Sequence, residues 1–209
     1  MSKERPTVFI VDDDQSVRES LELLLTAAGF VPETFASAQE FLDQPRSPAP
    51  RCLVLDVNLP DLNGLELQTR IADDMGDMPV IFITGYGDVP TTVRAMKAGA
   101  VEFLTKPFGE DVLLGAIRHA IDRSCAVLAD AAVTRALRDR YASLTPREQE
   151  VIALVVSGRL NKQVGGDLGI SEITVKAHRG KMMQKMKARS LPDLVRMASK
   201  LGLGVAPKA

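Results

Sequence analysis

Carboxylate side chains gather at the ends of two predicted strands in the first half of the chain. Asp12 and Asp13 follow the apolar run 7–11, and Asp56 closes the run that begins at residue 52. Continuous apolar runs of this length are typical of strands buried in a parallel sheet, whose carboxyl ends meet at one edge. Neighbouring carboxylates repel one another, so a hard divalent cation such as Mg²⁺ is the expected counter-charge. The sequence therefore predicts a magnesium-binding acidic site at this edge.

A hydroxyl group and an ammonium group are expected at the same edge of the sheet. Thr84 ends the apolar run 80–84, and Lys106 follows the predicted strand 101–105. Beside a carboxylate and a cation, these groups form a receptor for a phosphoryl group, because they stabilise the charge that moves during its transfer. Each residue alone has a plainer interpretation: Thr84 as a strand residue, Lys106 as a surface lysine, and Asp14 as the cap of the next helix. Their joint placement at four strand ends favours the site.

Strand and helix patterns alternate over the first 124 residues. Helical spacing of apolar residues separates the apolar runs, and a further helix is expected from Asp111. This alternation predicts an α/β doubly wound domain with a five-stranded parallel sheet and helices on both faces. Strands are expected at 7–11, 31–35, 52–56, 80–84 and 101–105, and helices at 17–28, 37–43, 65–75 and 89–98.

The two halves of the chain carry opposite charge. The formal net charge is −1, yet residues 1–124 hold 20 acidic and 11 basic side chains, whereas residues 125–209 hold 7 acidic and 15 basic ones. Such asymmetry indicates a nucleic-acid partner for the basic half. We expect an α/β domain at 1–124, a helical linker at 125–142 and an all-helical basic domain at 143–209.

Composition disfavours several other classes of protein. Two cysteines far apart indicate no disulfide framework, and two histidines argue against a His/Cys zinc site. No signal-peptide pattern and no apolar stretch of membrane-spanning length occur in the sequence. A cytoplasmic protein without a membrane partner is therefore expected.

Start and stop signals divide the basic domain into four helices. Thr145 with Glu148 three residues later forms a capping box, and Ser171 and Ser190 are further N-cap residues. A short turn joins the predicted helix 161–168 to the helix that begins at Ser171, as in a helix-turn-helix motif. An all-α four-helix domain is the result, and it is open to two interpretations: a DNA-binding domain or a protein-interaction module with a basic face.

The helix that begins at Ser171 has one apolar face and one basic face. At about 100° per residue, Val175, Met182 and Met186 share the core face. Small residues lie opposite with lysines along both edges, which suits a helix in the DNA major groove whose edges meet phosphates. His178 is interpreted equally well as a phosphate contact or as a partly buried core residue. The candidate base contacts are Lys176, Lys181 and Gln184, and the candidate phosphate contacts are Thr174, His178, Arg179 and Lys185.

The first domain resembles the receiver domain of two-component signalling, which has a flavodoxin-like (CheY-like) fold. The match covers roughly residues 5–124, and it rests on Asp12-Asp13, Asp56, the run Leu59-Pro60-Asp61-Leu62-Asn63-Gly64, Thr84 and Lys106-Pro107. The resemblance implies a cis peptide bond at Lys106-Pro107 and phosphoryl transfer from a sensor histidine kinase. The implied roles are Mg²⁺ binding by Asp12, Asp13, Asp56 and the backbone carbonyl of Asn58, phosphoryl acceptance by Asp56, transfer chemistry by Thr84 and Lys106, and a switch formed by Thr84 and Phe103.

The last domain resembles the LuxR-type output domain, over about residues 143–204. The match rests on the runs Leu144–Val151, Asn161–Val164, Leu168–Ser171 and Thr174–Arg179. The whole chain thus resembles the NarL/FixJ class of response regulators, and its linker and 103–108 segment resemble the FixJ branch. The resemblance implies a phosphorylation-controlled transcription regulator that binds duplex promoter DNA, works with RNA polymerase and is not an enzyme. It also implies a homodimer through the helix 89–98, the fifth strand and the helix after it.

Two rival functions follow from the same residues. An aspartate-nucleophile phosphatase would carry the phosphoryl group on Asp12, but the basic half of the chain would then have no purpose. A receiver with a protein-binding output would use the basic helices without DNA. Two departures from the LuxR-type pattern also matter: Gly165-Gly166 either soften their helix or permit close packing, and Gly180 leaves no side chain to read a base.

Overall fold

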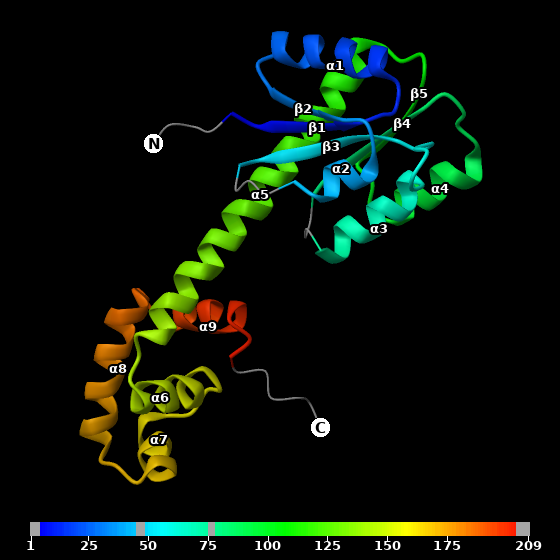
Figure 1. The fold of residues 1–209 in the computed structure, drawn as a ribbon. Helices are drawn as coiled ribbons and strands as arrows, with labels where there is room; N and C mark the ends of the chain where they lie inside the picture. The colour runs from blue at the N-terminus through cyan, green and yellow to red at the C-terminus, as the bar shows by residue number, and fades with distance from the viewer. Residues whose placement is uncertain (1–4, 45–48, 75–77, 204–209) are drawn as a thin grey trace. The chain divides into compact units, whose positions relative to one another are not determined.

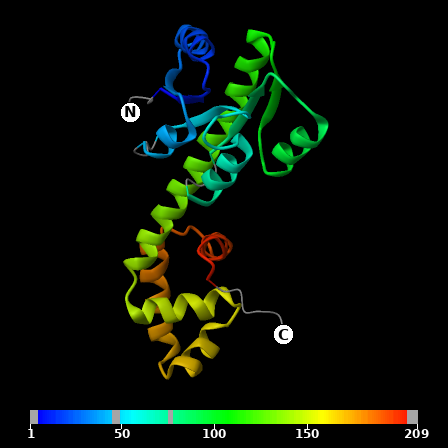
Figure 2. The same ribbon diagram turned by 45° about the vertical axis from the view of Figure 1, so that its right-hand side comes forward.

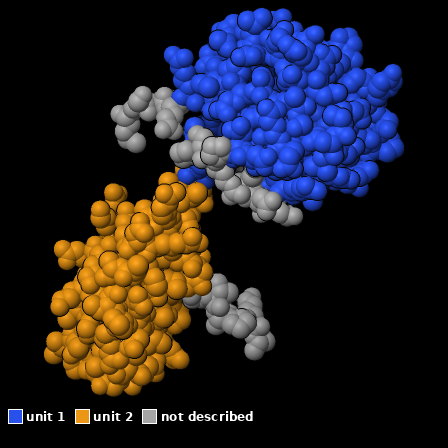
Figure 3. Space-filling model, viewed as in Figure 1, with its two compact units in different colours: residues 1–128 blue, residues 129–209 orange. Residues whose placement is uncertain are grey.

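The computed structural model describes residues 5–44, 49–74 and 78–203, and it divides into two compact units (Figure 3). Residues 1–128 form the N-terminal unit and residues 129–209 the C-terminal unit. The last residue of the predicted helix 65–75 and the ends of the chain, 1–4 and 204–209, lie outside the described residues. In the described part of the chain, no helix has the length and hydropathy needed to cross a membrane.

The N-terminal unit is built on a parallel sheet with the strand order β2-β1-β3-β4-β5. This arrangement confirms the predicted doubly wound α/β fold. The strands are β1 (Thr7–Val11), β2 (Val31–Phe35), β3 (Arg51–Asp56), β4 (Val80–Thr84) and β5 (Glu102–Thr105). The helices are α1 (Gln15–Ala27), α2 (Ala38–Leu42), α3 (Gly64–Asp74), α4 (Val89–Lys97) and α5 (Glu110–Ala142).

Helices cover both faces of the sheet (Figure 1). Side chains of alternate strand residues point to opposite faces, so each strand contributes to two apolar cores. Leu53 of β3 packs with the aromatic and aliphatic residues of α2, α3 and α4, whereas Val54 packs with α1 and the first turns of α5. Burial on both sides explains why the strands have continuous apolar sequences, and it fixes the edge at which the strand ends meet.

The C-terminal unit contains α6 (Pro146–Val156), α7 (Asn161–Leu168), α8 (Glu172–Met186) and α9 (Leu191–Lys200) around one apolar core (Figure 2). The capping box of Thr145 and Glu148 is present, and Ser171 and Ser190 cap α8 and α9 as predicted. Gly169 ends α7 in the left-handed conformation with φ of 65°, which favours glycine.

The predicted linker 125–142 lies entirely within α5. Its last turns belong to the C-terminal unit, because Leu137 is buried and Tyr141 packs against the core that α6, α8 and α9 share. Arg140 donates a hydrogen bond to the carbonyl of Met186, and Lys200 of α9 forms an ion pair with Asp130. Residues 129–142 therefore contribute to the folded C-terminal unit.

Candidate functional site

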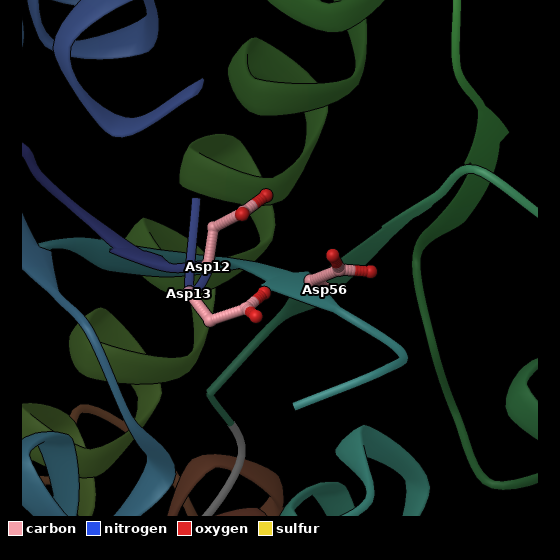
Figure 4. A group of neighbouring side chains, drawn as sticks. All are labelled: Asp12, Asp13 and Asp56. Atoms are coloured by element: carbon pink, nitrogen blue, oxygen red, sulfur yellow. The ribbon is translucent and has the colours of Figure 1, made fainter. Parts of the chain in front are cut away.

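Three carboxylates lie together at the carboxyl ends of β1 and β3 (Figure 4). Asp12 and Asp13 follow β1, and Asp56 is the last residue of β3. One carboxylate oxygen of each residue lies within 4.8 Å of the others. Asp12 and Asp56 are buried, whereas Asp13 is exposed. Three oxygen donors, two of them shielded from water, fit a hard cation such as Mg²⁺.

Lys106 contacts two of these carboxylates across the sheet edge. Its Nζ lies 2.7 Å from Asp12 Oδ2 and 3.3 Å from Asp56 Oδ2. Burial of the ammonium works to lower the pKa of Lys106, but the hydrogen bond and charge of Asp12, followed by the charge of Asp56, raise it above the ordinary value. The Lys106-Pro107 peptide bond is cis, as the resemblance implied. Lys106 is thus a fixed positive charge beside Asp56.

Asp56 has the environment expected of a partly shielded nucleophile. Burial raises the pKa of Asp56, while the charge of Lys106 and the hydrogen bond from the backbone N–H of Asn58 act to lower it, and the net direction is upward. The Asn58 nitrogen lies 3.3 Å from Asp56 Oδ1. The Lys106 ammonium and the backbone of the following loop therefore orient both oxygens of this carboxylate.

The two predicted switch residues lie on β4 and β5, the strands that follow β3 in the sheet. Thr84 is fully buried at the end of β4, and its hydroxyl exchanges hydrogen bonds of 3.2 Å with the backbone N–H and carbonyl of Tyr86. Phe103 is half-buried on β5 and lies against Phe82, with 6.0 Å between ring centroids. The structure thus gathers Asp12, Asp13, Asp56 and Lys106, and it places Thr84 and Phe103 on the next two strands of the sheet.

Two further residues shape the loop after β1. Asp14 caps α1 by accepting a hydrogen bond of 2.8 Å from Ser16 N, which confirms its plainer interpretation. Arg18 of α1 was not among the predicted site residues, yet its Nη1 donates hydrogen bonds to the carbonyls of Asp12 and Asp13 at 2.8 and 3.0 Å. The sequence does contain a signal for this role, because Arg18 is the single basic residue of α1 and lies in its first turns, just after the acidic run.

The second candidate surface is the outward face of α8. Val175, Met182 and Met186 are fully buried on the inward side, as the helical spacing predicts. The exposed residues of the outward side are Lys176, Ala177, Gly180, Lys181 and Gln184, together with Ile173, which is not among the predicted DNA contacts. The same spacing places Ile173 on this face, because it precedes Ala177 by four residues and Gly180 by seven.

Two of the predicted phosphate contacts, Lys185 and Arg179, form hydrogen bonds with other helices of the C-terminal unit. Lys185 lies against α6, where its Nζ is 2.6 Å from Glu148 Oε2 and 3.3 Å from the carbonyl of Ser143. Arg179 donates a 2.6 Å hydrogen bond to Asn161 Oδ1 of α7. These internal bonds favour structural roles for both residues, and their contact with phosphate stays a prediction.

The remaining two candidates, Thr174 and His178, lie half-buried on the flank of α8. The Thr174 hydroxyl lies 2.8 Å from the Ser171 hydroxyl, which caps the same helix. Lys176, a candidate base contact, forms an ion pair of 3.0 Å with Glu172 one turn earlier. Thr174 and His178 also stay predictions.

Glu148 is a buried carboxylate that holds α8 against α6. The hydrogen bond from Lys185 and the one from the backbone N–H of Thr145 lower the pKa of Glu148, and they outweigh the opposite effect of burial. The negative charge of Glu148 is thus balanced by the Lys185 ammonium.

Close packing explains one of the two adjacent glycines in α7. A Cβ at Gly165 would lie 2.7 Å from the carbonyl oxygen of Ile170 in the turn before α8, whereas a Cβ at Gly166 would meet nothing within 4 Å. Of the two explanations offered by the sequence, close packing therefore applies to Gly165. Gly180 also faces open space on the outward side of α8.

Comparison with known proteins covers both units. The response regulator receiver domain family matches residues 8–118, and the luxR family of bacterial regulatory proteins matches residues 142–198. Nodulation protein W of Bradyrhizobium diazoefficiens is 48% identical over 196 residues, which span 94% of this chain and 86% of that protein. The transcriptional regulatory protein FixJ of Rhizobium meliloti is 45% identical over 198 residues, with coverage of 95% and 97%.

A solved structure of the response regulator StyR is 48% identical, covers 94% of this chain and 100% of its own, and superposes with a TM-score of 0.82. The chain therefore belongs to the NarL/FixJ class of two-component response regulators, and its receiver domain and LuxR-type DNA-binding domain make it a transcriptional regulator.

Proposed function

We propose that Asp56 accepts a phosphoryl group from a sensor histidine kinase and that phosphorylation controls promoter binding by α8. The observation that carries this proposal is the position of the Lys106 ammonium, 2.7 Å from Asp12 and 3.3 Å from Asp56 at the rim where Asp13 also lies. A carboxylate nucleophile, a fixed cation and a further acidic pair are the groups that phosphoryl transfer to aspartate requires.

The transfer is a displacement at phosphorus. An oxygen of Asp56 attacks the phosphorus of a phosphohistidine, the phosphorus–nitrogen bond breaks, and the imidazole nitrogen keeps the bonding electron pair. Lys106 stabilises the negative charge on the transferred oxygens. Mg²⁺, when held by Asp12, Asp13, Asp56 and the backbone carbonyl of Asn58, would supply further positive charge at the same place. Water later hydrolyses the acyl phosphate and regenerates the Asp56 carboxylate. Because the phosphoryl group is gained and lost on the protein's own aspartate, no separate substrate is turned over and the protein is not an enzyme.

The conformational switch uses Thr84 and Phe103. Thr84 exchanges its bonds with the backbone of Tyr86 for a bond to a phosphoryl oxygen, and Phe103 fills the space that Thr84 vacates. The face formed by α4, β5 and α5 then becomes the surface of a homodimer. Its exposed apolar side chains support this role: Val89, Val93 and Met96 on α4, and Val112 on α5.

The dimer presents two copies of α8 to duplex promoter DNA. Lys176 and Lys181 flank the outward face, so their charges complement the phosphates on both sides of the major groove. Gln184 on the same face offers both a donor and an acceptor to base edges. RNA polymerase is the further partner through which bound protein acts on transcription, and the cytoplasm is the proposed location.

The test locates the phosphoryl group. Full-length protein is incubated with Mg²⁺ and a small acyl phosphate, and the acyl-phosphorylated residue is trapped chemically and identified by mass spectrometry. We expect modification of Asp56 in the wild type and none in Asp56→Asn. Asp14→Asn is the matched control, because Asp14 belongs to the same acidic run but only caps α1, and it should still be modified. Modification of Asp12, as in a phosphatase, or uptake by Asp56→Asn at the wild-type rate contradicts the proposal.

A further inference from the structure

Ile173 is an apolar side chain placed in water at the start of α8. It is the second residue of the helix, and 80% of its surface is exposed. No other large apolar side chain described in residues 129–203 is as exposed. Isoleucine is β-branched and has no particular advantage in a helix over straight-chain residues. Neither packing nor helix propensity therefore accounts for isoleucine at this position.

The neighbours of Ile173 define the surface to which it belongs. Ala177, Gly180 and Gln184 follow at four, seven and eleven residues, so all four lie along the centre of the outward face. Ala177 and Gly180 are exposed and small, and a Cβ at Gly180 would meet nothing within 4 Å. The backbone of α8 can thus approach a surface closely, and Ile173 is the large apolar group on this face.

The charges around this face identify the class of partner. Lys176 and Lys181 are exposed at its two edges, and Lys187 follows at the end of the helix. Glu172 is the acidic residue beside Ile173, and its charge is compensated by the 3.0 Å ion pair with Lys176. A positively edged face on the second helix of a helix-turn-helix motif matches the phosphate rims of a DNA groove.

The groups that base pairs present in the major groove then indicate what Ile173 would contact. Residues near the N-terminus of a recognition helix meet base edges. An isoleucine side chain neither donates nor accepts a hydrogen bond, and the thymine C5-methyl is the apolar group that base pairs present in the major groove. We infer that Ile173 packs against a thymine methyl group and makes the protein select thymine at one position of each half-site. This inference rests on the proposed entry of α8 into the major groove.

The test removes the methyl group from the DNA and the side chain from the protein. Full-length protein, phosphorylated with Mg²⁺ and a small acyl phosphate, is first used to select a bound duplex from random sequences. Each thymidine of that duplex is then replaced singly by deoxyuridine, which forms the same base pair but lacks the methyl group. Dissociation constants are measured at one fixed salt concentration for the wild type, Ile173→Ala and the control Val133→Ala, an exposed apolar position on α5.

We expect one thymidine whose replacement weakens wild-type binding about fourfold, the effect of exposing roughly one methyl group. At that position Ile173→Ala should bind both duplexes equally, whereas Val133→Ala should keep the wild-type difference. Thermal unfolding checks that Ile173→Ala is folded, as expected for a substitution at an exposed site.

Two results overturn the inference and can be told apart. If a duplex is selected but every deoxyuridine affects the wild type and Ile173→Ala alike, Ile173 does not read a methyl group, and a loss of transcription in that variant would assign the side chain to a protein partner. If no duplex is selected at all, the DNA-binding role of α8 fails, and the inference fails with it.

Discussion

At the scale of single residues, the ion pair between Glu148 and Lys185 links the stability of the C-terminal unit to a charge. Glu148 is 2% exposed and accepts hydrogen bonds from Lys185 and from the backbone of Thr145. A buried carboxylate is stable only while such donors compensate for its lost hydration. The pair therefore acts as a clamp between α6 and α8.

Replacing Glu148 with Gln should lower the free energy of unfolding of the C-terminal unit by about 2 kcal/mol, the usual scale for a hydrogen-bonded charge. Glutamine keeps the capping-box geometry, so the change isolates the charge. Urea unfolding followed by circular dichroism measures it. The control is Glu150→Gln, which breaks an exposed pair with Arg147 and should cost less than about 0.5 kcal/mol. Equal losses in the two variants would show that Glu148 has no special role.

The same clamp gives stability a defined pH dependence. The pKa of Glu148 is lowered in the folded state, so its contribution is complete above the ordinary, unfolded pKa and is lost as the pH falls through the lowered, folded pKa. The difference in unfolding free energy between wild type and Glu148→Gln should therefore shrink on acidification below the ordinary value. A difference that stays constant down to the acid transition would contradict this account.

At the scale of helices and strands, the sequence predicts most boundaries because caps act locally. Thr145, Ser171 and Ser190 begin helices and Gly169 ends one within the few residues that a capping motif covers. The rim of the sheet was equally predictable, since parallel strands bring their carboxyl ends together.

Side-chain pairs between distant elements were beyond local reasoning. Lys185 and Glu148 are 37 residues apart, so no spacing rule connects them. Helical spacing places Lys185 at one edge of the outward face and so predicts a phosphate contact, which stays a prediction. Only the structure shows that its ammonium lies 2.6 Å from Glu148 Oε2. For Arg18 and Ile173, helical spacing predicts the position of the residue on its helix. It does not predict that Arg18 donates hydrogen bonds to the carbonyls of Asp12 and Asp13, or what Ile173 contacts.

The adjacent glycines of α7 provide a matched pair of substitutions. Gly165→Ala should destabilise the C-terminal unit by about 1–3 kcal/mol, because the new methyl group collides with the Ile170 carbonyl. Gly166→Ala should stabilise it by up to about 1 kcal/mol, because the site is exposed and alanine favours helix. Thermal or urea unfolding measures both. A gain in stability in both variants would contradict this account, because it would mean that the Ile170 carbonyl moves away from the new methyl group at little cost.

At the scale of the whole molecule, the proposed homodimer should depend on the exposed apolar side chains of α4. Val93→Asp should prevent the phosphorylation-dependent homodimer while leaving Asp56 phosphorylation intact, because the carboxylate would have to be buried in the interface. Size-exclusion chromatography with light scattering reports the mass. Val133→Asp, an exposed valine of α5 in the C-terminal unit, should still dimerise. A normal dimer of Val93→Asp would move the interface elsewhere.

The last turns of α5 determine which fusion points are suitable in a chimera of this protein with another receiver domain. Leu137, Arg140 and Tyr141 pack or bond with the C-terminal unit although they precede the LuxR-type match, which starts at residue 142. A chimera that grafts this output onto a foreign receiver at residue 142 would remove those contacts and expose apolar surface. Crossover near residue 128, inside the continuous helix, keeps them, so biosensors assembled from this regulator should carry the tail of α5 as part of their reporter module.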